Sequence, residues 1–169
     1  MTRPFLDRLA SLVLGQGRDI VDRHDQLLLT RWYVWPRTRD QENRDGRRVR
    51  VLLHRLAGDD SDRELHDHPW SFVSITLGGR GYLEWIPNRH HGENGRACRS
   101  QVERRPWTVA YRPAEWLHAV KLHRHPETSD LVPQWTLVIA GPRRRAWGFL
   151  TTSGWERWDI YWHRVTGGR

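Results

Sequence analysis

The sequence has one cysteine, Cys98, and one lysine, Lys121, among its 169 residues. A single cysteine excludes an intramolecular disulfide framework, so we expect the chain to reside in a reducing compartment, the cytoplasm. No apolar run approaches the roughly 20 residues that cross a bilayer, which argues against a membrane protein. At this length one domain, residues 1–169, can bury a core without disulfides or structural metal ions.

Lysine is so scarce that arginine supplies nearly all of the positive charge. The chain has 28 Lys and Arg residues against 20 Asp and Glu residues, a net charge of +8 at pH 7. Such a balance is compatible with nucleic-acid binding. The arginines are dispersed, however, and many alternate with acidic residues, as in a solvated basic surface. Nucleic acid is therefore not the favoured partner, and a small-molecule substrate is.

Short apolar runs predict an all-β fold. The segment 4–15 is expected to be an amphipathic helix rather than a secretory signal, because Asp7 and Arg8 precede its short apolar stretch. From residue 26 onward, runs rich in β-branched and aromatic residues are separated by turn-forming clusters, which is typical of a sandwich or barrel. We expect strands at 27–35, 48–56, 71–77, 81–86, 107–113, 117–123, 135–141 and 146–150.

The segments are expected to organise as an N-terminal helical part (1–25), a barrel (26–152) and a C-terminal segment (153–169) packed on the outside of the barrel. Two polar stretches, 37–47 and 87–96, are expected to be surface loops. Edge strands and the tryptophan-rich C-terminal segment also make a homodimer a prediction to test.

The segment 62–84 carries the residues with the clearest chemical meaning. Side chains two residues apart in a strand share a face, so His66 and His68 point one way and Asp67 the other way. A metal site needs a further ligand, and His118 follows Pro113 near a later strand. A lone His-x-His pair is common by chance and can belong to a loop, whereas the two elements together predict a metal site.

The first element resembles the first motif of the cupin superfamily, which runs His-x-His, three or four residues, an acidic ligand, six residues and a Gly. This chain matches the motif at His66, His68 and Gly79, and has Phe72 at the acidic position. Because a phenyl ring cannot coordinate a metal, the resemblance implies a site of three histidines without that carboxylate.

The second element resembles the second cupin motif, Pro-x-Gly-x-x-His, at Pro113 and His118, with Glu115 in place of the Gly. The motifs and their strands span about residues 48–150. The resemblance implies a double-stranded β-helix, a jelly-roll barrel, with a short N-terminal helix in front of it. Within the superfamily the chain looks like the three-histidine type, such as cysteine dioxygenase, and like cupin-like proteins of bacteria and phages without an assigned reaction.

The resemblance implies a metal-dependent enzyme with His66, His68 and His118 as ligands. Three neutral imidazoles suit a divalent transition metal and leave coordination positions open, so we expect Fe(II), with Zn, Ni or Mn as alternatives. The expected function is a non-haem oxygenase acting on a small chelating anion. Two alternatives stay open: an isomerase, lyase or hydrolase that needs no dioxygen, and a non-catalytic cupin that binds a sugar, nucleotide or nucleic acid.

Tryptophan is abundant, with 11 residues, and favours an aromatic pocket wall. On the expected strand 48–56, Val49, Val51 and Leu53 form the most apolar face and are taken as the inner one. Arg55 then points inward, where it could bind a carboxylate or phosphate, and His54 points outward. A salt-bridged rim position is the alternative for Arg55, and a plain turn position is the alternative for Glu115. The candidates for the substrate pocket are Arg55, Trp70, Phe72, Tyr82 and Glu115.

Overall fold

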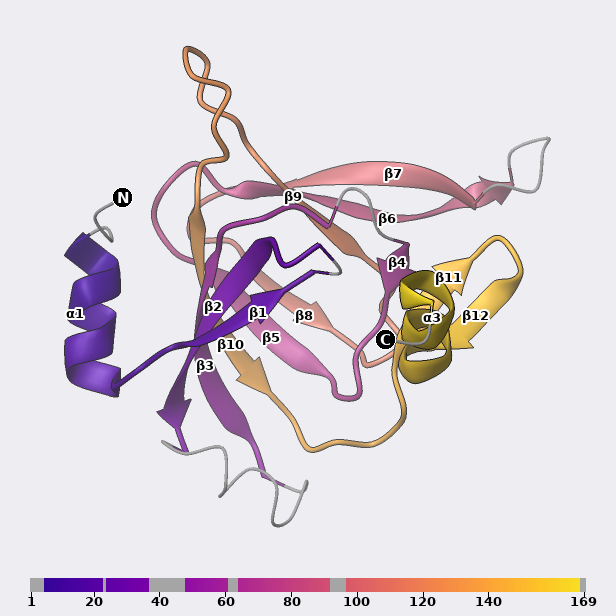
Figure 1. Cartoon of the computed structure of the whole chain (residues 1–169), viewed down its shortest axis with the longest axis horizontal. Coiled ribbons are helices and arrows are strands. Elements are labelled where there is room, and N and C mark those ends of the chain that lie inside the picture. Colours follow the sequence, from indigo (N-terminus) through magenta and orange to yellow (C-terminus); the bar gives the residue numbers. More distant parts are fainter. Residues whose placement is uncertain (1–4, 23, 37–47, 61–63, 92–96, 168–169) are drawn as a thin grey trace.

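The computed structural model describes residues 5–22, 24–36, 48–60, 64–91 and 97–167. The expected loop 37–47 lies outside these residues. The described residues form a β-rich sandwich with one helix near each end (Figure 1). The prediction of an all-β fold with a short N-terminal helix is confirmed. No helix in the described part of the chain is long and apolar enough to span a membrane.

The helices and strands follow one another in this order: α1 (Phe5–Leu14), β1 (Arg18–Val21), β2 (Leu27–Trp35), β3 (Arg50–Leu56), β4 (Leu65–His66), β5 (Phe72–Thr76), β6 (Tyr82–His91), β7 (Ala97–Arg104), β8 (Val109–Arg112), β9 (Ala119–Leu122), β10 (Gln134–Ala140), β11 (Gly148–Thr151), β12 (Gly154–Arg157) and α3 (Trp158–Thr166). Three antiparallel sheets result. The large sheet has the strand order β1-β2-β3-β10-β5-β8, and the two small sheets have the orders β12-β11-β4 and β7-β6-β9. In Figure 1 the sheet β7-β6-β9 runs along the top, and the sheet β12-β11-β4 lies on the right beside α3.

The inner face of the large sheet carries the core. Burial alternates along β5, where Phe72, Ser74 and Thr76 are buried. The core cluster and the residues packed against it are Leu52, Phe72, Val138, Ala140, Tyr33 and Trp70.

The outer face of the large sheet is also apolar where α1 covers it. Trp32 of β2 is 2% exposed and stacks on Trp135 of β10, with ring centroids 5.4 Å apart. Asp7 of α1 pairs with Arg55 of β3, with 3.1 Å between Oδ1 and Nε. Strands at this end therefore bury apolar side chains on both faces, so periodicity alone does not tell which face is the inner one.

The sequence patterns miss four strands: β1, β4, β7 and β12. The expected loop 87–96 is partly wrong, because β6 continues through His91 and pairs with β7 from Ala97 onward. The sequence of β7, ACRSQVER, is mostly polar, and it forms a strand because its backbone pairs with the longer strand β6. β1 pairs with β2, so the N-terminal segment adds a strand to the large sheet.

The turn after β5 requires the glycine of the first motif. Gly79 has a φ of +119°, and a Cβ atom on it would lie 2.9 Å from Oε1 of Gln134. The buried Gln134 side chain accepts a hydrogen bond from the N–H of Gly81 and donates hydrogen bonds to the carbonyls of Leu77 and Gly78. The turn that leads from β5 into β6 is thereby held to the neighbouring strand β10.

Candidate metal centre

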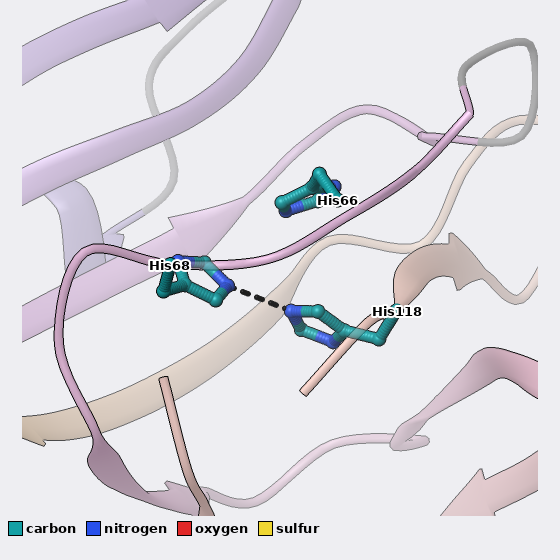
Figure 2. Close-up of side chains that lie close together, drawn as sticks. All are labelled: His66, His68 and His118. Carbon is teal, nitrogen blue, oxygen red and sulfur yellow. Dashed lines mark hydrogen bonds between the residues drawn. The ribbon is translucent and has the colours of Figure 1, made fainter. Parts of the chain in front are cut away.

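Three histidines from two distant segments meet in the structure (Figure 2). His66 ends β4, His68 follows it after one residue, and His118 directly precedes β9. The backbones of His66 and His118 form an antiparallel bridge, with N–H to O distances of 2.9 Å in both directions. The backbone therefore joins the two sequence motifs at the position of their histidines.

The imidazole rings converge on one another. Their candidate ligand nitrogens all lie within 4.8 Å of each other, and Nε2 of His68 is 2.8 Å from Nε2 of His118, the contact drawn in Figure 2. Asp67 contacts a different set of groups, as the strand parity predicts. Three imidazole nitrogens at this spacing form a donor set suited to a transition metal.

The surroundings keep His68 neutral. Burial lowers its pKa well below the ordinary value, and the two neighbouring imidazoles and the guanidinium groups of Arg31 and Arg112 lower it further. A neutral imidazole carries the lone pair that binds a metal, so few protons compete with an ion for this nitrogen at neutral pH.

A buried carboxylate stands behind His118. Glu84 of β6 is fully buried, and its Oε1 lies 2.7 Å from Nδ1 of His118. Arg112 donates to both oxygens of Glu84, from Nε at 2.7 Å and from Nη2 at 2.8 Å, and Trp116 donates from Nε1 at 3.2 Å. Glu84 thereby fixes the ring orientation that turns Nε2 of His118 toward His68, as carboxylates do behind metal-binding histidines.

The pKa of Glu84 follows from these contacts. Burial alone would raise it, but the hydrogen bonds and charges of His118 and Arg112 outweigh burial and hold the pKa well below its ordinary value. The sequence reasoning missed Glu84. The available signal was its place between Leu83 and Trp85 on an apolar strand, since a glutamate on the inner face of such a strand must be paired.

Asp67, between the two histidines of the first motif, anchors them to the sheet β12-β11-β4. Its side chain is almost fully buried and accepts hydrogen bonds from Gly148 N–H at 2.7 Å and Trp155 Nε1 at 2.9 Å. It also forms an ion pair with Arg145. Three donors on one carboxylate fix the backbone on which His66 and His68 stand.

Aromatic side chains of the C-terminal part of the chain pack next to the three histidines. His66 lies beside both Trp147 and Phe149, with ring centroids 6.4 and 6.1 Å away. Phe149 stacks on Tyr161 of α3 at 4.0 Å, and Trp147 stacks on Trp158 at 5.9 Å. Helix α3, which lies outside the sequence resemblance, is therefore packed against the layer that supports the histidines.

A cavity of about 340 Å³ opens onto the three histidines. Three of the predicted pocket residues, Trp70, Phe72 and Tyr82, line this cavity. Glu115 is exposed and does not line it, as expected for a turn residue. Burial raises the pKa of Tyr82, so its hydroxyl stays protonated at neutral pH and remains a hydrogen-bond donor.

The inward orientation predicted for Arg55 is wrong. β3 turns Arg50, Leu52 and His54 to the buried side, and His54 lines the cavity. Arg55 lies on the opposite face, where it pairs with Asp7 of α1. The error arises because the apolar set Val49, Val51 and Leu53 belongs to the outer face, which is apolar near α1.

The arginine that does line the cavity is Arg31 of β2, which the sequence reasoning missed. Its backbone is the register partner of His54, and its Nε donates to Nε2 of His54 at 2.9 Å. No local pattern identifies Arg31, because β2 carries apolar or aromatic residues on both faces and the pairing with His54 depends on the register of β2 and β3.

Comparison with known proteins identifies the fold. No protein-family model and no curated protein sequence matches this chain. Among solved structures, the DMSP lyase DddQ from Ruegeria pomeroyi DSS-3 matches with a TM-score of 0.50 and 14% sequence identity, over 87% of this chain and 66% of that one. The fold is that of a cupin.

Two further matches have lower scores. The cupin-2 domain Rru_A2000 from Rhodospirillum rubrum has a TM-score of 0.44 and 13% identity, over 82% of this chain and 72% of that one. The oxalate decarboxylase from Lactobacillus farciminis has a TM-score of 0.46 and 12% identity, over 80% of this chain. This chain spans 33% of the length of that decarboxylase.

Proposed function

We propose that this cupin is a metal-dependent enzyme that binds a divalent transition metal through His66, His68 and His118 and acts on a small chelating anion. The observation that carries the proposal is the convergence of three imidazoles at the wall of a cavity of about 340 Å³. A cavity of this size accommodates a small molecule.

The donor set fits such an ion. His68 is neutral, Glu84 orients His118, and Asp67 fixes the backbone between His66 and His68. When bound, a divalent ion would supply positive charge and open coordination positions for a chelating anion. We propose Fe(II) and a dioxygen-dependent reaction as the first candidate.

Other side chains line the cavity next to the three histidines. Apolar side chains of the large sheet, such as Leu52 and Val138, line part of the cavity wall. The Tyr82 hydroxyl accepts a hydrogen bond from Nη2 of Arg112 at 3.3 Å and keeps its own proton, so it can donate to a bound oxygen atom. Trp70 stands beside His68, with ring centroids 6.5 Å apart, and limits the space next to this imidazole.

Metal content tests the proposal directly. Protein purified without a metal-binding tag is expected to hold about one equivalent of a transition metal per chain, measured by mass spectrometry of the metals. His118→Ala should lose most of this metal, whereas His125→Ala, a change at an exposed histidine, should retain it. Wild-type protein that takes up no transition metal, or a His118→Ala variant that binds metal as wild type does, would overturn the proposal.

Oxygen uptake then separates the reaction classes. Fe(II)-loaded protein is mixed with a panel of thiolates, 1,3-diketones and 2-hydroxy acids, and oxygen consumption is compared with that of His118→Ala and Zn-loaded protein. An oxygenase consumes dioxygen only in the Fe(II)-loaded wild type. Substrate conversion without oxygen uptake would instead favour an isomerase, lyase or hydrolase, and binding without conversion would favour a non-catalytic cupin.

A further inference from the structure

The outer face of the large sheet is apolar across the four neighbouring strands β3, β10, β5 and β8. Leu52, Ser74 and Val138 line the cavity on the inner face, so the residues next to them in these strands point outward. The strand register places the outward residues in two cross-strand rows: Val51, Ile139, Val73 and Tyr111 in one row, and Leu53, Leu137, Ile75 and Val109 in the other. Directly opposed residues of antiparallel strands share a face, so the two rows form one continuous apolar surface.

This arrangement reverses the usual pattern of a sheet with one solvated face, in which polar residues point outward. In β5 the buried inner residue Ser74 is polar, whereas the outward residues Val73 and Ile75 are apolar. Among the described residues of these four strands, Arg55 is the one charged residue on the outer face, and Asp7 of α1 pairs with it. A continuous apolar surface of this kind marks an interaction site.

Helix α1 covers the outer face at β2 and β3, whereas the end at β8 is exposed. Trp107 lies two residues before Val109, and its ring lies beside Gly78 at the end of β5. The exposed side chains at this end are Trp107 at 70%, Val109 at 63%, Tyr111 at 67% and Ile139 at 38%. Because a large aromatic side chain has about 150–250 Å² of surface to bury, these four residues present about 500 Å² in total.

This area matches what one subunit contributes to a stable dimer. A standard interface takes about 800 Å² from each partner. In homodimers about 65% of that surface is apolar, or about 500 Å² for each subunit. The exposed end of the face is therefore large enough to hold two copies of the chain together.

We infer that two copies of this chain pack face to face through the β8 end of the apolar surface. A two-fold interface places the same patch on both copies, so an apolar face is complementary to itself. None of the eight residues in the two rows is charged, so the surface offers no counterpart to a partner that is recognised by its charge. The inference goes beyond the proposed function and does not depend on a metal.

The mass of the full chain in solution tests the inference. Light scattering or sedimentation at micromolar protein concentration should give twice the chain mass of 20.2 kDa. Hydrogen exchange of residues 107–111 should be slower in the dimer than in protein diluted below the dissociation constant.

Substitutions assign the contact to this face. Val109→Arg and Tyr111→Arg should each raise the dissociation constant of the dimer about a hundredfold or more, because each dimer then buries two unpaired like charges. Val21→Arg is the control: Val21 is 43% exposed on β1, at the opposite edge of the large sheet, and its substitution should leave the dissociation constant unchanged. If one variant does not fold, judged by circular dichroism, the other variant and the hydrogen exchange of 107–111 decide.

A wild-type chain that stays monomeric throughout the micromolar range would contradict the inference. A dimer that both substitutions leave intact would do the same, since it would use another surface. Wild-type protein that stays monomeric but binds phosphatidylcholine vesicles, and loses this binding in Val109→Arg, would assign the face to a lipid surface and overturn the dimer.

Discussion

Replacing Asp67 by Asn tests how the two histidines of the first motif are held in place. The substitution keeps the size of the side chain but turns one carboxylate oxygen into an amide group that donates. Oδ1 accepts from the N–H of Gly148, and Oδ2 accepts from Arg145 and from Nε1 of Trp155. Either orientation of the amide therefore sets an NH₂ group against at least one donor.

The expected cost follows from these contacts. Losing the charge on a hydrogen bond to an arginine costs about 1.5–3 kcal/mol, and leaving a buried donor unpaired costs about 1–3 kcal/mol. Because the Arg145 side chain is 29% exposed, solvent screens part of its charge, so we expect a total near the lower end, about 3 kcal/mol. A domain of this kind has a free energy of unfolding of about 5–15 kcal/mol.

Two measurements check the Asp67→Asn prediction. Urea unfolding followed by tryptophan fluorescence should show the loss of stability, and competition with a chromophoric chelator should show a metal affinity about 10–100-fold lower, as for other residues behind metal ligands. Asp159→Asn, the same change at an exposed carboxylate bonded to Arg157, is the control and should alter neither. If Asp67→Asn unfolds and binds metal as wild type does, Asp67 does not position the histidines.

Three further changes probe other parts of the molecule. Glu84→Gln should lower metal affinity about 10–100-fold in the same chelator assay, whereas Glu103→Gln, at an exposed position, should not. Trp32→Ala should cost about 3–5 kcal/mol in urea unfolding and leave the metal affinity of the folded protein unchanged. Because the folded pKa of His54 is lowered, the unfolded state binds its proton more tightly. In EDTA, the free energy of unfolding should have its full value above about pH 6.5. At lower pH it should decrease, by up to about 1.4 kcal/mol per pH unit for this group. His54→Gln should remove that part of the slope, and His125→Gln should not.

The strands that the sequence predicts most accurately belong to the large sheet and carry buried apolar side chains. β2 spans the predicted residues 27–35, and β5 and β10 begin or end within one residue of prediction. β4 has only two residues, too few to show an alternating sequence pattern. β7 is recognisable only through its pairing with β6. Local sequence patterns predict strands with a buried face, whereas the partner strand decides where polar segments pair.

The residues of the site also differ in whether local sequence patterns reveal them. Strand parity and motif spacing predict that His66, His68 and His118 converge, because each relation is local or tied to a motif. Glu84 reaches His118 from another strand, and Arg31 reaches His54 through the register of β2 and β3. Such contacts depend on sheet order, which one sequence does not reveal. The choice of Arg55 over His54 failed because α1 makes the outer face of β3 as apolar as its inner face.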